Sequence, residues 1–507
     1  MKLGVDFGTT RIVVASVDRG NYPLVPFETT EATFEWLPPL VALRGEERRY
    51  GWDAWAAQMD PTWTVVRSLK RYLEDAGPET VLEAGGTRVR VGDLLQGLLS
   101  NLRSALEDHF GEREKFEVML GVPANANSNQ RFLTVDGFRR AGFTVLGLLN
   151  EPSAASIEFG HRQRFSGRLL VYDLGGGTFD ASLVELDEKA HTVIATEGIS
   201  TLGGDDFDRV LGEMALGSEK MATLAPDALF RLEEECRRQK EALHPNSRRM
   251  VVDLDLVEEG LGQVIISVPD FYERCRPLLD ETVAATARLA STSEIDALYI
   301  TGGGSEMPLV ARMLRDEFGR KVKRSEYTRS ATAIGLAIQA DSTSGYELHE
   351  VFTRNFGVWR ESEAGHRMVF DPIFPRGTRL PASGEPPLTV SRTYYPVHNI
   401  GHFRYLEASQ VSVDEQPAGD ITVWDEILFP FDPAQRGADL QNASVERTLW
   451  DLQEVEECYA CDAAGVVTAT VRNLTSGYGQ DYQLGKWSSK EAVVKPKGTK
   501  RARKTSG

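Results

Sequence analysis

The feature that most constrains this chain is a short pattern that occurs near its start and again in its middle. Residues 3–17 and 169–186 each read as two β-branched runs separated by a glycine-threonine turn, which is a hairpin signal. Each first run ends at an aspartate, Asp6 or Asp173. This duplication predicts two related α/β lobes that face each other across a cleft. The turn residues are Gly8, Thr9 and Thr10 in the first copy and Gly175, Gly176, Gly177 and Thr178 in the second.

These residue types are what a triphosphate and its metal require. Glycine lets backbone N–H groups approach phosphate oxygens, and the threonine hydroxyls add hydrogen bonds. A carboxylate at a strand end binds Mg²⁺, usually through water. One such turn would be weak evidence, and two ordinary tight hairpins are the alternative interpretation. The chain has no GxxxxGK[ST] segment, so a P-loop nucleotide site is not supported.

The residues around the two copies alternate between helical and strand patterns. Residues 91–110 and 127–143 have helical periodicity, 116–124 read as a strand, and 145–160 read as a strand, a turn and a helix. After the second copy we expect helices over 230–246, 269–290 and 331–340, and strands over 250–257 and 263–268. Residues 297–318 read as a strand, the glycines Gly302–Gly304 and a helix, whose free N–H groups would receive the ribose or α-phosphate.

The composition changes after the polar stretch 341–345. Prolines, aromatics and short alternating runs predict an all-β domain. The predicted organisation is a nucleotide-binding domain over 1–340, a linker over 341–350, a β-sandwich over 351–486 and a basic disordered tail over 487–507.

Composition narrows the classes of function. A formal net charge of −18 argues against a general nucleic-acid binder, because phosphate contacts need a basic face. Neither a signal peptide nor a membrane-spanning stretch is visible, so we expect a cytoplasmic protein. Cys458 and Cys461 form a lone CxxC, a weak zinc signal that we interpret as two small residues in a strand, with a redox pair as the alternative.

Several segments together resemble the heat-shock 70 kDa (DnaK-type) chaperone family of the actin-like ATPase superfamily. They are VDFGTT, VYDLGGGTFD, LNEPSAASI, YITGGG, VVRSLKRYL, GVPANANSNQRFLTVDGFRRAGF and TLGGDDFDRVL. The resemblance covers nearly all of residues 1–340. More faintly, residues 356–381 and 461–484 resemble the opening and closing strands of that family's peptide-binding β-sandwich. The implied fold is a two-lobed, duplicated ribonuclease H-like α/β ATPase followed by an all-β sandwich.

The resemblance also implies roles for individual residues. Lys70 would contact the γ-phosphate, Glu151 would act on the metal's water shell or the attacking water, and Asp173 would orient water and Mg²⁺. Thr178 would bond the γ-phosphate, and Asp6 would join the water shell of Mg²⁺ and of a K⁺ ion. Without the resemblance, Lys70 would read as a surface lysine and Glu151 as a helix-start acid.

Further nucleotide contacts and a coupling switch follow from the same resemblance. Pro123 and Arg131 match the family's switch between domains. The predicted cofactor contacts besides the hairpin turns are Gly203, Gly204, Lys240, Gly302, Gly303 and Gly304.

The sequence departs from the family pattern in three places. Glu241 and Glu306 occupy the positions of two arginines that clamp adenine, so we expect weaker ATP binding. The linker is polar where the family has leucines that dock on the ATPase domain, which puts the coupling between the two domains in question. A short basic tail stands where a helical lid is usual, so we expect fast ligand exchange.

The leading hypothesis is an ATP-hydrolysing chaperone with ATP and Mg²⁺ as cofactors. It would bind unfolded or extended polypeptide clients, with co-chaperones as possible partners. The alternative keeps the fold as an ATP-binding recruitment module with weak or no hydrolysis. A sugar kinase of the same superfold is a third hypothesis, against which the resemblance of the β domain argues.

Overall fold

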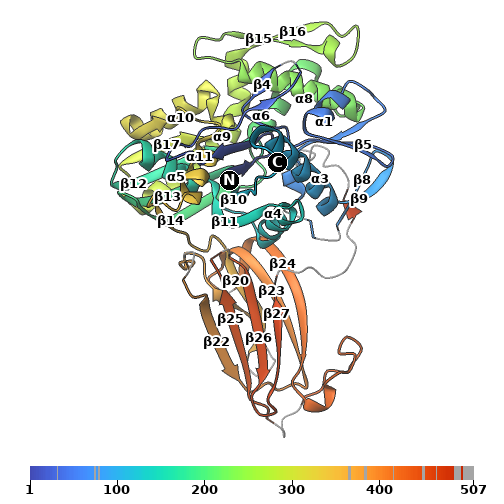
Figure 1. Ribbon diagram of the computed structural model, residues 1–507, viewed down its shortest axis with the longest axis vertical. Helices are drawn as coiled ribbons and strands as arrows, with labels where there is room; N and C mark the ends of the chain where they lie inside the picture. The colour runs from blue at the N-terminus through green and yellow to red at the C-terminus, as the bar shows by residue number, and fades with distance from the viewer. Residues whose placement is uncertain are drawn as a thin grey trace.

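The structure is a computed structural model of the chain. It describes all residues except 31, 74–75, 78–79, 363–366, 382–384, 415, 448–451, 464, 485–492 and 495–507. Two α/β lobes lie together at one end of the molecule, and an elongated all-β domain projects from them (Figure 1).

Both predicted hairpins form, and each lies inside a sheet of the same pattern. In the first sheet, β1 pairs with β2 on one side in antiparallel fashion and with β10 on the other in parallel. The strand order is β11-β10-β1-β2. The strands are β1 (Lys2–Phe7), β2 (Ile12–Ser16), β10 (Glu117–Val122) and β11 (Thr144–Asn150).

The second sheet repeats this arrangement. Its strand β12 pairs antiparallel with β13 and parallel with β17, as β1 does with β2 and β10. The order is β18-β17-β12-β13-β14-β19. The strands are β12 (Gly167–Leu174), β13 (Phe179–Asp187), β14 (Ala190–Ile199), β17 (Ala297–Thr301), β18 (Val322–Arg324) and β19 (Glu347–His349). The duplication inferred from the two aspartate-glycine patterns is therefore confirmed at the level of sheet topology.

Two helices join the sheets, α5 (Glu151–Arg162) and α11 (Ala331–Ala340). They pack on each other, with α11 also against β1, β2 and β10 and α5 against β12 and β13. The approach is very close, because a Cβ on Gly4 of β1 would lie 2.2 Å from the backbone nitrogen of Ala337. The small residues of α11 allow this contact between a helix and a strand.

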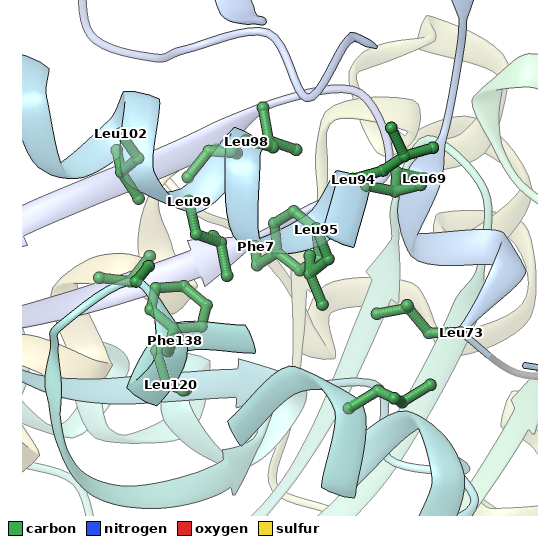
Figure 2. Close-up of a cluster of buried hydrophobic side chains, with 14 of the residues drawn as sticks. Phe7, Leu69, Leu73, Leu94, Leu95, Leu98, Leu99, Leu102, Leu120 and Phe138 are labelled. Atoms are coloured by element: carbon green, nitrogen blue, oxygen red, sulfur yellow. The ribbon is translucent and has the colours of Figure 1, made fainter. Parts of the chain in front are cut away.

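The other faces of the two sheets carry longer helices. Successive side chains of a strand point to opposite faces, so Gly4 faces α11 while Leu3, Val5 and Phe7 enter the main core of the first lobe. In that core the leucines of α3 lie over Phe7, Leu120 and Phe138 (Figure 2). The first lobe contributes α3 (Val91–Phe110) and α4 (Ser128–Arg140), and the second α6 (Gly204–Leu216), α9 (Val268–Thr292) and α10 (Pro308–Phe318). A further helix of the second lobe, α8 (Pro226–Glu241), packs on α6.

Smaller elements surround the first lobe and extend the second. The sequence analysis did not predict them as individual elements, except for the strands at 249–253 and 263–267. They are β3 (Phe27–Glu28), β4 (Thr33–Phe34), β5 (Val41–Arg44), β6 (Glu47–Tyr50), α1 (Gly51–Ala57), β7 (Thr64–Val66), α2 (Leu69–Tyr72), β8 (Val81–Ala84), β9 (Thr87–Arg90), α7 (Ser218–Met221), β15 (Arg249–Asp253) and β16 (Gln263–Ser267).

The β domain is a sandwich of two four-stranded antiparallel sheets, with orders β21-β20-β23-β24 and β22-β25-β26-β27. Its core lies between them and is rich in aromatic rings, including Phe356, Tyr405 and Tyr459. The strands are β20 (Asn355–Ser362), β21 (Arg367–Phe374), β22 (Leu388–Tyr394), β23 (Ile400–Val411), β24 (Pro417–Pro430), β25 (Val455–Cys461), β26 (Val467–Asn473) and β27 (Tyr478–Gln483).

Three local predictions need correction. The triple glycine does not open an α-helix: a one-turn 3₁₀-helix, Gly303–Glu306, comes first, and α10 begins at Pro308, which has no N–H to offer. Part of the predicted linker is ordered, because β19 pairs with β14. In the tail predicted to be disordered, β28 (Val493–Val494) pairs with the open edge of β8, while the other tail residues lie outside the described ones.

Cys458 and Cys461 lie three positions apart in β25 and so point to opposite faces of the strand. They are free thiols, Cys461 buried and Cys458 half-buried. The interpretation as two small residues of a strand is confirmed, and this geometry leaves no shared zinc or redox site between them. Among the described helices, none has the length and apolar character needed to cross a membrane.

Candidate functional site

A cleft between the two lobes collects most of the predicted nucleotide residues. It has a volume of about 800 Å³, counting its open mouth. Asp6 and Asp173, from the two hairpins, line the same space. The other predicted residues along it are Gly8, Thr9, Thr10, Lys70, Glu151, Gly175, Gly176, Thr178, Gly204, Lys240, Gly302, Gly303 and Gly304.

The two turns have matching backbone geometry. The Gly8 N–H donates to the Arg11 carbonyl at 3.0 Å, and the Gly175 N–H donates to the Thr178 carbonyl at 2.9 Å. A Cβ on Gly8 would lie 2.5 Å from the Arg11 carbonyl oxygen, so the tight turn requires glycine there. The two aspartate-led hairpins thus present equivalent turns to one cleft.

Two predicted glycines do not line the cleft. A Cβ on Gly177 would meet the Arg71 guanidinium at 2.5 Å, because Arg71 lies across this turn and donates to the Gly177 carbonyl. A Cβ on Gly203 would lie 2.6 Å from the backbone of Gly176. Gly177 therefore leaves room for the Arg71 side chain, and Gly203 lets two backbone segments pack behind the turn. The neighbouring Gly204 N–H fixes that packing by donating to the Gly175 carbonyl at 2.9 Å.

Lys70 is held in place by an unusual local backbone. It lies in the four-residue helix α2, which follows Ser68 in a left-handed conformation with φ 56°. Non-glycine residues adopt this conformation at a cost of about 1–2 kcal/mol, and such strain is concentrated at functional sites. The Lys70 side chain is 5% exposed, and its Nζ lies 2.5 Å from Oε1 of Glu151.

Glu151 is at the start of α5, beside Pro152 in the first turn. This position fixes the carboxylate at the carboxyl end of β11, where it points into the cleft toward Lys70. Burial disfavours the Lys70 ammonium, but Glu151 and Asp6 outweigh it and raise the pKa of Lys70. Lys70 therefore stays charged in the cleft.

The acidic groups of the cleft repel one another. Burial, and then the charge of Glu151, raises the pKa of Asp6 to about 7. The pKa of Asp173 is raised well above its ordinary value, first by burial and then by Glu151 and Asp6. Asp180 of β13, which the sequence analysis did not select, lines the small cavity next to the cleft, and burial and Glu151 raise its pKa to about 7. Buried acids of this kind favour a divalent cation.

The donor set fits Mg²⁺ held through water and phosphate rather than by a cage of side chains. Within the part of the chain that the structure describes, no three His, Cys, Asp or Glu side chains lie close enough to hold a bare ion. Mg²⁺ keeps several waters and is commonly bound by one or two carboxylates plus substrate phosphates. Asp6 and Asp173 fit that role.

Lys240 and the glycines after β17 form the other side of the cleft. Nζ of Lys240 donates to the Gly204 carbonyl at 2.6 Å and pairs with Asp208 at 2.7 Å. A Cβ on Gly302, whose φ is 85°, would clash with Asp173 and the Leu174 carbonyl. Gly302 therefore permits the close contact between this loop and the strand that ends at Asp173.

The cleft also contains charged residues that the sequence analysis passed over or interpreted differently. Glu241 pairs with Arg11 and Arg329, and Arg329 also pairs with Glu306. Arg11 directly follows Thr10 in the turn between β1 and β2, and this position next to a predicted phosphate contact could have identified it from the sequence. Arg329 lies just before α11 and had no motif to identify it.

The β domain contains a second, larger cavity of about 1520 Å³, counting its mouth, at the end of the sandwich where β22 leads into β23. Two of its lining residues, Arg360 and Tyr394, bond to the buried Glu457, Arg360 twice at 2.9 and 2.7 Å, and Tyr459 also donates to Glu457. Its lining also includes His398, whose Nδ1 lies 3.2 Å from the Glu361 carboxylate. The apolar residues lining it include Trp359, Met368, Tyr395, Ile400, Phe403, Phe431 and Val445.

Comparison with known proteins identifies the family. The model of the Hsp70 protein family matches residues 74–355, more than half of the chain. This chain belongs to the Hsp70 family. The family resemblance drawn from the phosphate-loop segments is confirmed, and it implies a two-lobed actin-like ATPase followed by a β-sandwich, with which the two related sheets and the sandwich are consistent.

A curated relative in the Hsp70 family is a chaperone protein HscA homolog from Methylibium petroleiphilum, with 32% identity over 410 residues. The alignment covers 75% of this chain but 65% of that protein, so this Hsp70 chain spans slightly less than two thirds of the relative's length. Members of the family bind ATP with Mg²⁺ and are ATPases.

Proposed function

We propose that this Hsp70-family chain is an ATP-dependent molecular chaperone. Its lobes bind and hydrolyse Mg·ATP, and its β domain binds extended segments of unfolded polypeptide in the cytoplasm. The observation that carries the proposal is the placement of two aspartate-led hairpin turns, from two related sheets, on one cleft together with Lys70.

The residues have distinct roles in this proposal. The turn around Thr9 and the turn around Thr178 donate hydrogen bonds to the phosphates. Asp6 and Asp173 hold Mg²⁺ through water, and Mg²⁺ when bound neutralises charge on the phosphates. Lys70 approaches the terminal phosphate, and Glu151 orients Lys70 and the attacking water. Catalysis is therefore mainly positioning and charge neutralisation.

The cavity of the β domain is the proposed polypeptide site. Apolar side chains such as Tyr395 and Phe403 line it, while Arg360 and Tyr394, which also line it, bond to Glu457. Sandwich edges and loops of this kind bind extended chains through main-chain hydrogen bonds, with pockets for alternate side chains. Co-chaperones would be further partners.

A path from the cleft to the β domain supports coupling between the two sites. Pro123 lines a small cavity beside the phosphate turns together with Lys70 and Asp180. From the same segment, Arg131 donates to Asn150 at 2.6 Å, and the Asn150 N–H donates to Glu350 in the linker at 2.9 Å.

The alternative is a recruitment module that binds ATP and hydrolyses it weakly or not at all. The glutamates at 241 and 306 favour it, because they replace expected arginines.

Single-turnover phosphate release from Mg·ATP, with and without an unfolded polypeptide, separates these functions. We expect release that the polypeptide accelerates and that Lys70→Ala reduces at least about 100-fold, the scale of losing a charge-stabilising group. Lys323→Ala, on exposed β18, is the matched control. Nucleotide binding without release in the unaltered protein would favour the recruitment module instead.

A further inference from the structure

Four charged side chains form an alternating chain of ion pairs beside the nucleotide cleft. Arg11 lies 2.7 Å from Glu241, Glu241 lies 3.1 Å from Arg329, and Nε of Arg329 donates to Glu306 at 2.8 Å. We call Arg11, Glu241, Arg329 and Glu306 the ion-pair tetrad. They come from the turn between β1 and β2, the end of α8, the segment before α11 and the 3₁₀-helix Gly303–Glu306. The ion-pair tetrad therefore joins four separate segments of the chain.

Arg329 has the central position in the tetrad. Its stem lies over the glycine loop, because a Cβ on Gly303 would be 3.7 Å from Cγ of Arg329. Nε and Nη2 of its guanidinium bond Glu306, and Nη1 bonds Glu241. The N–H donors of a guanidinium lie in its plane, so these bonds orient the group without using its flat faces.

The surroundings of Arg329 determine what those faces can contact. The side chain is 34% exposed and lines the cleft together with Gly302, Gly303 and Gly304. Arg11 is engaged differently, because its guanidinium lies over the ring of Trp36 at 4.9 Å. Arg329 is thus the member of the tetrad with a planar cation beside the glycine loop. A planar cation of this kind stacks on aromatic rings.

We propose that Arg329 stacks on the purine base of the bound nucleotide and that Glu241 and Glu306 orient it for this contact. The inference rests on the proposed function, because it takes the cleft to be a nucleotide site. It also changes one expectation from the sequence. Glu241 and Glu306 replace two arginines of the family, and this replacement predicted that the cleft has no guanidinium to contact the base. In the proposal, the two glutamates instead hold the guanidinium of Arg329 at the cleft. Arg329 is accordingly a specificity-determining residue: it makes the cleft bind purine nucleotides more tightly than ligands that have no base.

Calorimetric titration of the full chain with Mg·ADP and with Mg·pyrophosphate tests the proposal. We expect Arg329→Ala to weaken Mg·ADP binding roughly 5- to 30-fold, the range for a partly desolvated cation–π contact. Binding of Mg·pyrophosphate should stay unchanged, because that ligand has no base. Arg329→Lys should behave like Arg329→Ala, because an ammonium keeps the charge but not the plane. Arg312→Ala, an exposed arginine of α10 that lies over Tyr272, is the matched control.

Glu306→Ala provides a second variant that leaves Arg329 in place but removes an anchor. We expect a smaller loss of Mg·ADP affinity and again no effect on Mg·pyrophosphate. Unchanged Mg·ADP binding by Arg329→Ala, or equal losses for both ligands, would overturn the stacking role while leaving the nucleotide site intact. If the unaltered protein bound neither ligand, the nucleotide site itself would fail, and this proposal with it.

Discussion

Buried acids in the cleft set the chemistry at the scale of single residues. Asp173 and Asp180 are buried and Asp6 is half-buried, and the cation beside them is Lys70, already paired with Glu151. In water these carboxylates ionise at about pH 4. In the cleft, ionisation is opposed by burial and by like charges, so protons or a divalent cation are needed to balance them.

This arrangement predicts that the protein without nucleotide loses stability as the pH rises. Asp6 and Asp180 have pKa values of about 7 in the fold, above those in the unfolded chain. The folded state therefore binds more protons than the unfolded state between about pH 4 and 7, and the free energy of unfolding falls across that window, by up to a few kcal/mol per group. Thermal unfolding at pH 5 to 8 measures it.

Two comparisons identify the source of this pH dependence. Asp6→Asn should flatten it, whereas Asp187→Asn, on the exposed end of β13, should not. Saturating Mg·ADP should also flatten it by supplying the missing positive charge. A slope that is the same in all these conditions would assign the pH dependence to other groups.

Single residues of the cleft were predictable when they belonged to a repeated pattern. Asp6 and Asp173 end matching strands, and glycine and threonine follow both. Arg329 and Asp180 were not predictable in this way, because their importance comes from neighbours distant in sequence. The four-residue helix that carries Lys70 has too little periodicity to read, so its role depended on the family resemblance.

At the scale of elements, the packing of α11 gives the closest contact with backbone that a glycine makes possible in the described fold. A Cβ on Gly335 would lie 1.8 Å from the carbonyl oxygen of Ala154 in α5. The helix was predicted from its small residues, and the bounds 331–340 are confirmed. The sequence did not reveal that small residues are needed on two sides of α11, because both α5 and strand β1 pack closely against it.

We predict that Gly335→Ala destabilises the protein severely. Alanine favours helices over glycine by about 0.5–1 kcal/mol, but the clash with backbone outweighs that gain and costs at least about 1–3 kcal/mol. Gly92→Ala is the matched control, because its Cβ would meet only the flexible end of Arg140, at 3.2 Å. Chemical denaturation of both variants measures the difference. Equal stability of the two would show that α11 moves aside at low cost.

At the scale of the whole molecule, the linker packs against the second lobe although its composition is polar. Leu348 lies in β19 opposite His191 of β14, and Leu348 and Val351 pack against the core of the second lobe. Beyond it, Arg376 of the β domain donates to the Thr196 carbonyl and pairs with Glu197. The sequence did not predict the docking, because a single leucine among serines, glycine and acids carries no periodic signal.

We predict that Leu348→Asp uncouples the two sites. An aspartate would be unpaired against an apolar core, so β19 should leave the sheet. Basal phosphate release should persist, while its acceleration by unfolded polypeptide should be lost. Val413→Asp is the matched control, because Val413 is fully exposed in the turn after β23. Acceleration retained by Leu348→Asp would show that coupling does not pass through β19.

The position of α11 in the chain also has a consequence for biosynthesis. The first sheet begins with residue 2, yet the helix that covers its inner face ends at Ala340. A ribosome must therefore translate the whole second sheet, except its last strand, before the first strand can be covered on that side. Until then the nascent chain carries an uncovered β-surface, to which chaperones that act on nascent chains have access.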